Sequence, residues 1–159
     1  MSYRISTREQ GRVGAFVAGM LDCHFYDFEA LGLERDGELI AGVVYNEFTG
    51  PDVQMHVAAI PGRRWLTKEF LWFAFAYPFI QLGCLRVSGR VGSKNEDALR
   101  LNYHLGFEYE ATLKHAIFGE DLILLVMWQE KCRFLNMKGA RKWAGKEAEQ
   151  CQHPISKAA

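Results

Sequence analysis

Residues 53–91 restrict the fold of this chain more than any other part of the sequence. Val53–Ile60 predicts a strand, and Thr67–Leu82 is apolar almost all round, which predicts a deeply buried helix. Leu85–Val91 alternates and predicts a second strand. A strand, a helix and a strand in this order favour parallel pairing through a right-handed crossover. Pro78 should kink the predicted helix or unwind its end.

The elements around this unit predict antiparallel neighbours. Asp36-Gly37 lies between two strand-like runs, Glu29–Arg35 and Glu38–Phe48, and Asp-Gly is a typical hairpin turn. Thr7 is placed to cap a helix over Arg8–Leu21. The other predicted elements are a strand at Tyr3–Ser6, a helix that begins at Asn95, and strands at Phe107–Leu113 and Leu122–Trp128. The predicted fold class is α/β, with a mixed, mostly antiparallel twisted sheet, one parallel crossover and flanking helices.

The composition is that of one globular domain. Hydrophobic residues make up 49% and charged residues 24% of the 159 positions, which is enough to build a substantial core. The formal net charge is zero, so we expect no general attraction to nucleic acid or to a membrane surface. The longest apolar run, Phe70–Ile80, is too short to span a bilayer. Four scattered cysteines without metal-binding spacing indicate reduced thiols, so we expect a cytoplasmic protein without a metal site.

Charge is distributed unevenly along the chain. Residues 129–159 contain seven Lys or Arg against three Glu, whereas the first 128 residues contain twelve basic and sixteen acidic side chains. Phe134 and Trp143 are interspersed with the basic residues. We therefore predict a main domain over residues 1–130 and a basic helical extension over residues 131–159, partly disordered at its end. This extension is the one predicted segment suited to nucleic acid.

The most specific motif lies over Asn95–Phe107. Asn95 is placed to cap the first turn of a short helix, and Gly106 is a typical left-handed stop. Physical chemistry alone predicts only a capped helix. The order Asn, Ala three residues later, Leu-Gly-Phe and then Glu110-Ala111 resembles the closing motif of the GNAT superfamily of N-acetyltransferases. The predicted element order is likewise similar to the acyl-CoA N-acyltransferase fold of that superfamily.

A second run extends the resemblance. Tyr77-Pro78-Phe79, Leu82-Gly83 and Arg86-Val87 resemble a run of the ribosomal-protein N-terminal acetyltransferase branch. Similar runs occur in phage-encoded relatives, so a phage origin, with the host cytoplasm as the place of action, is an open alternative. The resemblance implies that residues 1–130 are an acetyltransferase domain.

The resemblance implies acetyl-CoA as the cofactor. Two arginines precede the helix that begins near Thr67, and free amides at a helix start attract phosphate groups. GNAT enzymes carry small residues where this chain has Thr67 and Glu69, which is a departure from the pattern. The pantetheine arm is expected between the strand that ends near Ile60 and the strand from Leu85, where the strands splay apart. The implied cofactor-binding residues are Ala58, Ala59, Ile60, Arg63, Arg64, Trp65, Leu66, Thr67, Asn95 and Asn102.

The implied reaction is direct attack by a primary amine on the thioester in a ternary complex. A backbone N–H within Ala58–Ile60 would polarise the thioester carbonyl. His56 and Glu47 are candidate general bases, and Asp121 is a third; the sequence assigns none of them alone.

The acid that protonates the leaving thiolate is commonly a Tyr seven residues after the Asn. This chain has Asn102 at that position, and Tyr103 is rotated from it by about 100° on a regular helix. The implied catalytic residues are therefore His56, Glu47, Asn95 and Tyr103.

Structural interpretations stand beside these functional ones. A histidine among apolar neighbours is more often part of a satisfied sheet than a base, and Asn95 is equally well explained as a helix cap. The altered phosphate loop and the missing Tyr leave a second class open, a catalytically degenerate acetyltransferase fold that acts as a binding or inhibitory protein. Asp22 and Asp27 would suit a cationic amine acceptor, which the sequence does not identify. A homodimer is also an open alternative.

Overall fold

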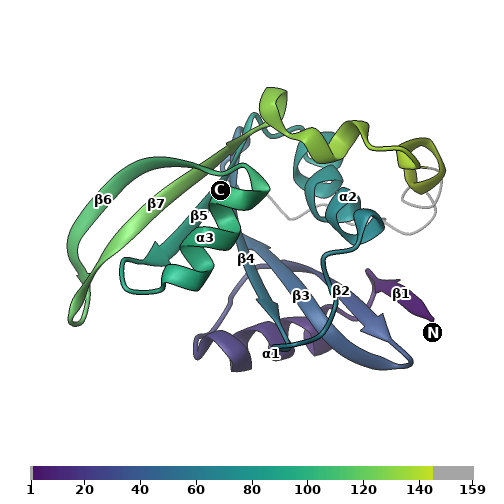
Figure 1. Ribbon diagram of the computed structural model, residues 1–159, viewed down its shortest axis with the longest axis horizontal. Helices are drawn as coiled ribbons and strands as arrows, with labels where there is room; N and C mark the ends of the chain where they lie inside the picture. Colours follow the sequence, from purple (N-terminus) through teal and green to yellow (C-terminus); the bar gives the residue numbers. More distant parts are fainter. Residues whose placement is uncertain (1, 145–159) are drawn as a thin grey trace.

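The computed structural model describes residues 2–144, in which seven strands form one sheet (Figure 1). The strand order is β1-β2-β3-β4-β5-β7-β6, and only the β4–β5 pair is parallel. The predicted fold class is therefore confirmed. The strands are β1 Tyr3–Ser6, β2 Glu29–Arg35, β3 Glu38–Asn46, β4 Asp52–Ala59, β5 Arg86–Gly92, β6 Glu108–Ile117 and β7 Glu120–Trp128. The helices are α1 Gln10–Leu21, α2 Lys68–Ala76, η1 Tyr77–Gln81, α3 Glu96–Leu105, η2 Gln129–Lys131 and η3 Arg133–Asn136.

Helices cover both faces of the sheet. The alternation of side chains along β4 shows which helices lie on each face. Val53 and Met55 are buried in the core cluster that contains α2 and the end of α3. Ala58 belongs to a second cluster with α1. Even-numbered β4 side chains therefore face α1, and odd-numbered ones face α2 and α3. None of the helices within residues 2–144 is long and apolar enough to cross a membrane.

The buried helix ends earlier than predicted, and Pro78 supplies the reason. The α-helix stops at Ala76 and continues as a π-helical turn in which the Leu82 N–H donates to the Tyr77 carbonyl at 3.0 Å. Proline has no N–H to donate to the carbonyl of Ala74 four residues earlier. That carbonyl instead accepts a hydrogen bond from the Tyr45 hydroxyl. The predicted unwinding thus takes the form of a π-turn.

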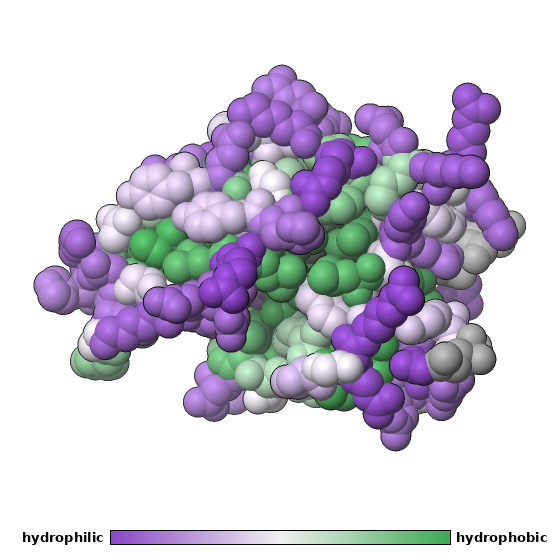
Figure 2. Space-filling view, in the orientation of Figure 1, coloured by the Kyte–Doolittle hydropathy of each residue, from purple (hydrophilic) through white to green (hydrophobic). Residues whose placement is uncertain are grey.

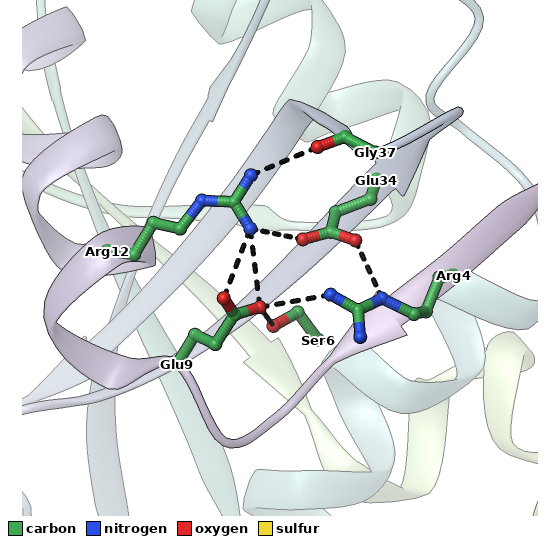
Figure 3. Close-up of polar contacts among 6 residues, drawn as sticks. All are labelled: Arg4, Ser6, Glu9, Arg12, Glu34 and Gly37. Atoms are coloured by element: carbon green, nitrogen blue, oxygen red, sulfur yellow. Dashed lines mark hydrogen bonds and ion pairs between the residues drawn. The ribbon is translucent and has the colours of Figure 1, made fainter.

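The start of α1 also differs from the prediction, which had Thr7 as its cap. The N-cap is Glu9, and its carboxylate accepts hydrogen bonds from Ser6 and from two arginines (Figure 3). The same two arginines, Arg4 and Arg12, converge on Glu34, a β2 residue with only 2% of its surface exposed. This ionic cluster ties α1 to β1 and β2. The Glu9 side chain makes no cap hydrogen bond to the helix, because its carboxylate binds Ser6 and the two arginines instead.

The chain after β7 packs back onto the molecule. Cys132 and Phe134 are buried, and the Phe134 ring stacks on Phe75 of α2 with centroids 5.1 Å apart. Further along, the Trp143 ring lies 6.1 Å from that of Trp72. The part of the predicted basic extension over residues 145–159 lies outside the described residues.

Candidate active site

The central feature of the site is the place where β4 and β5 part. The two strands are paired only at Asp52–Arg86, Val53–Val87 and Gln54–Ser88, although β4 continues to Ala59 and β5 to Gly92. We call the unpaired stretch, residues 55–59 and 89–92, the β4–β5 divergence. In Figure 1, α2 and α3 lie on either side of it. Figure 2 shows apolar side chains in the centre of the same view, with hydrophilic residues around them.

The hydrogen-bond alternation of β4 decides which of its backbone groups enter the divergence. The Ile60 N–H donates to the Ile40 carbonyl of β3 at 2.8 Å. Antiparallel neighbours alternate between bonded and non-bonded pairs, so Ala58 also turns its backbone towards β3. Val57 and Ala59 turn theirs away, towards β5. Of the predicted oxyanion donors Ala58–Ile60, the geometry therefore retains Ala59 and adds Val57.

The loop over residues 60–67 leads from β4 into the N-terminus of α2. Thr67 is the N-cap, and its hydroxyl accepts a hydrogen bond from the Phe70 N–H at 3.2 Å. The Trp65 ring packs edge-on against Phe70, and Leu66 is partly exposed. Arg63 lies 3.8 Å from a carboxylate oxygen of Glu38, while Arg64 is exposed. The loop thus brings two cationic side chains and the positive end of a helix dipole to the open end of the divergence.

Asn95 and α3 form the other side of the divergence. The Asn95 side-chain oxygen accepts a hydrogen bond from the Ala98 N–H at 3.2 Å, so this oxygen caps the helix. Asn102 donates its side-chain amide to the Ala98 carbonyl at 2.7 Å within the same helix. Tyr103 is 47% exposed. Both Asn95 and the start of α2 lie just after the diverging ends of β5 and β4, which brings two helix N-termini to the same end of the molecule.

His56 lies on the α1 side of β4 in a partly buried aromatic setting. Its Nε2 is 2.9 Å from the Asn46 side-chain oxygen, and its ring lies 4.9 Å from that of Phe25. Burial lowers the pKa of His56 to about 4, and the positive charge of Arg90 acts in the same direction. The imidazole is therefore neutral at physiological pH. It is a weak proton acceptor and a well-positioned hydrogen-bonding group.

The other two candidate bases hold different positions. Glu47 follows β3 in a left-handed conformation with φ of 51°, and its carboxylate accepts hydrogen bonds from Gln54 and, at 3.4 Å, from Arg90. Asp121, at the start of β7, accepts from the His115 N–H at 2.9 Å and from Lys114 at 3.0 Å. The His115 N–H and then Lys114 lower the pKa of Asp121. Asp121 therefore stabilises the β6–β7 hairpin, whereas Glu47 lies near His56 and Arg90.

Two carboxylates on the α1 side of β5, those of Asp52 and Glu110, share a single arginine. Arg86 donates to Glu110, a hydrogen bond that raises the pKa of Arg86 and lowers that of Glu110. Its Nε also lies 3.5 Å from Asp52, whose carboxylate accepts a hydrogen bond from Ser88 at 2.6 Å. One arginine against two carboxylates leaves this group with a formal charge of −1, so most of its negative charge is neutralised.

Several residues that shape the site were not identified from the sequence. Val57 was missed because the direction of its N–H depends on the β3–β4 register, which cannot be derived from the sequence. Phe25 and Asn46 meet His56 only through folding. Arg90 had a usable signal, since alternation along a predicted strand places it on one face with Arg86.

Comparisons with known proteins show which solved structures share this fold. No protein-family model matches this sequence, and no curated protein matches it. Among solved structures, a chimera of the spermidine N-acetyltransferase SpeG from Vibrio cholerae and hSSAT superposes with a TM-score of 0.68 at 16% identity, covering 86% of this chain and all (100%) of that one. A mutant form of SpeG gives 0.69 at 16% identity, over 85% of this chain and 98% of the other. A dodecameric SpeG structure gives 0.67 at 17% identity, over 84% and 96%. The structure therefore shares the fold of these spermidine N-acetyltransferases, as the resemblance predicted.

Proposed function

We propose that this protein transfers an acetyl group from acetyl-CoA to a primary amine. The observation that carries the proposal is the β4–β5 divergence, into which β4 turns backbone groups and at whose open end two helices begin. The acetyltransferase fold supports the same conclusion.

The residues at the divergence fit acetyl-CoA. The backbone groups of Val57 and Ala59 can pair with the pantetheine amides as an added strand would. The first turn of α2 and the exposed Arg64 would hold the pyrophosphate. Two features weaken this cradle: the Thr67 hydroxyl already satisfies one amide of the first turn, and Glu69 adds a negative charge there. We therefore expect binding weaker than an all-small loop would give.

The chemistry requires a neutral amine that attacks the thioester carbon, so that a C–N bond forms and the C–S bond breaks. The Ala59 N–H is directed to stabilise the developing oxyanion. Neutral His56, held by Asn46, accepts a hydrogen bond from the amine and orients it, and water carries the released proton to solvent. Solvent or Tyr103, whose side chain is exposed, protonates the departing thiolate.

The acceptor is an amine whose identity is open to direct test. Spermidine is the first compound to try, because the structural neighbours are named for acetylating it. The pairing of Glu110 and Asp52 with Arg86 argues against a strongly anionic polyamine site on this face. A peptide with a free N-terminus is the second acceptor to test, because the sequence also resembles the ribosomal-protein N-terminal acetyltransferase branch. That branch, a phage origin, a cytoplasmic location and a homodimer stay predictions from the sequence.

Isothermal titration with acetyl-CoA tests the proposal. The wild type should bind in the micromolar range, Arg64→Ala should weaken binding, and Arg100→Ala on α3 is the matched control that should not. Asn95→Ser keeps a helix cap but loses the side-chain amide, so weaker binding by this variant would assign Asn95 to the ligand. Release of free thiol with each acceptor then measures transfer.

The departure of the phosphate loop from the GNAT pattern, at Thr67 and Glu69, supports a second candidate function. A catalytically degenerate fold that acts as a binding or inhibitory protein would retain the architecture and lose the cofactor. Absence of acetyl-CoA binding by the wild type at millimolar concentration would refute the transferase and favour this alternative.

A further inference from the structure

The segment after β7 joins the two helices on either side of the divergence. Arg133 donates hydrogen bonds to the Leu105 carbonyl at 3.0 Å and to the His104 carbonyl at 2.7 Å, which are the last carbonyls of α3. Its guanidinium also lies 4.6 Å from the centroid of the Phe134 ring. Phe134 is 5% exposed and stacks on Phe75 of α2 at an interplanar angle of 11°. We call Arg133 and Phe134 the clamp.

The clamp lies at the closed end of the divergence. β4 and β5 are paired near Arg86, and the Gln129 N–H donates to the Leu85 carbonyl at 3.0 Å, so the chain enters the clamp at this end. In Figure 1 this segment leaves β7 and passes over α2. The helices α2 and α3 begin at the open end, after β4 and β5, and run back towards the clamp. The clamp contacts the C-terminal half of each helix there, through Leu105 of α3 and Phe75 of α2.

A small rotation of α3 about the clamp moves its N-terminus, which lies at the open end of the divergence. The ten residues of α3 make a helix about 15 Å long, so a rotation of about 10° at the clamp moves its N-terminus by about 2.6 Å. That displacement is comparable to a hydrogen-bond length and would separate Asn95 from a ligand held by the first turn of α2. The two Arg133 hydrogen bonds and the charge of its guanidinium at the negative end of α3 oppose such a rotation.

We propose that the clamp sets the spacing of α2 and α3 for the cofactor, with Arg133 as a positioning residue that does not touch the ligand. This inference rests on the proposed acetyl-CoA site. It also means that part of the predicted extension, residues 131–144, belongs functionally to the acetyltransferase domain.

Acetyl-CoA titration and amide hydrogen exchange of the full chain test this inference. Arg133→Ala should raise the acetyl-CoA dissociation constant about tenfold, a change of about 1.4 kcal/mol, and should speed exchange in α3 without ligand. Arg133→Lys, which keeps the charge and one donor, should recover part of both effects. Lys131→Ala is the matched control: it removes an exposed ion pair to Glu108 in the same segment and should change neither.

The outcomes separate the two hypotheses. Wild-type affinity in Arg133→Ala overturns the clamp inference and leaves the transferase proposal intact. A wild type that binds no acetyl-CoA overturns both. If Arg133→Ala does not fold, the comparison of Arg133→Lys with Lys131→Ala decides, because equal affinity in these two variants and the wild type also overturns the inference.

Discussion

The ionic cluster around Glu34 allows a stability prediction whose size follows from its geometry. The Glu34 side chain is 3% exposed and accepts hydrogen bonds from Arg12 and, at 2.7 Å, from the Arg4 Nε (Figure 3). In Glu34→Gln one oxygen still accepts, but the new amide group meets a guanidinium and cannot. Hydrogen bonds to charged groups contribute about 1.5–3 kcal/mol each. The arginines are 64% and 42% exposed and regain water, which keeps the loss well below that of a fully buried pair.

We therefore expect Glu34→Gln to lower the free energy of unfolding by about 2 kcal/mol, measured by urea denaturation at pH 7. Arg100→Gln, which breaks an exposed pair with Asp97, is the control and should leave the midpoint unchanged. The Arg4 hydrogen bond is the main cause that lowers the pKa of Glu34 from its ordinary 4.5. The stabilisation is therefore complete above about pH 4.5 and is lost as pH falls through the folded-state pKa. Equal stability of Glu34→Gln and the wild type at pH 7 would refute this account.

Three further predictions concern the site and its support. Glu69→Gln should tighten acetyl-CoA binding by about two- to fivefold at low salt, because it removes a negative charge from the first turn of α2; unchanged affinity in the titration would place the phosphates elsewhere. His56, with a folded pKa of about 4 against 6.5, should make the wild type less stable at pH 5 than at pH 7, since the unfolded chain binds the proton first; urea midpoints of His56→Gln should lack this component. Phe134→Ala should cost about 3 kcal/mol by thermal or urea unfolding, and a chain ended at residue 130 should lose more; a truncated chain of wild-type stability would show that the segment is dispensable.

Patterns of near neighbours predicted most of the fold. The Asp36-Gly37 turn, the apolar helix between two strands and the capped helix at Asn95 are local signals, and each produced the expected element. Element boundaries were less predictable. The Pro78 effect was expected, but the π-turn form and the hydrogen bond from Tyr45 of β3 to the Ala74 carbonyl of α2 were not.

The candidate site divides in the same way. The resemblance placed acetyl-CoA between the strands that became β4 and β5, and their divergence is present in the structure. The pKa of His56 could not be predicted, because burial against Phe25 and the charge of Arg90 come from residues distant in sequence.

Residue type and short spacing were enough to derive the order of the elements, the cap at Asn95 and the likeness to an acetyltransferase. Tertiary structure decided which β4 amides enter the divergence, since their direction follows from the register with β3. It also decided that Arg133 caps α3 while Phe134 packs on α2. Contacts between distant segments depend on how the sheet and helices pack together, and no local pattern encodes them.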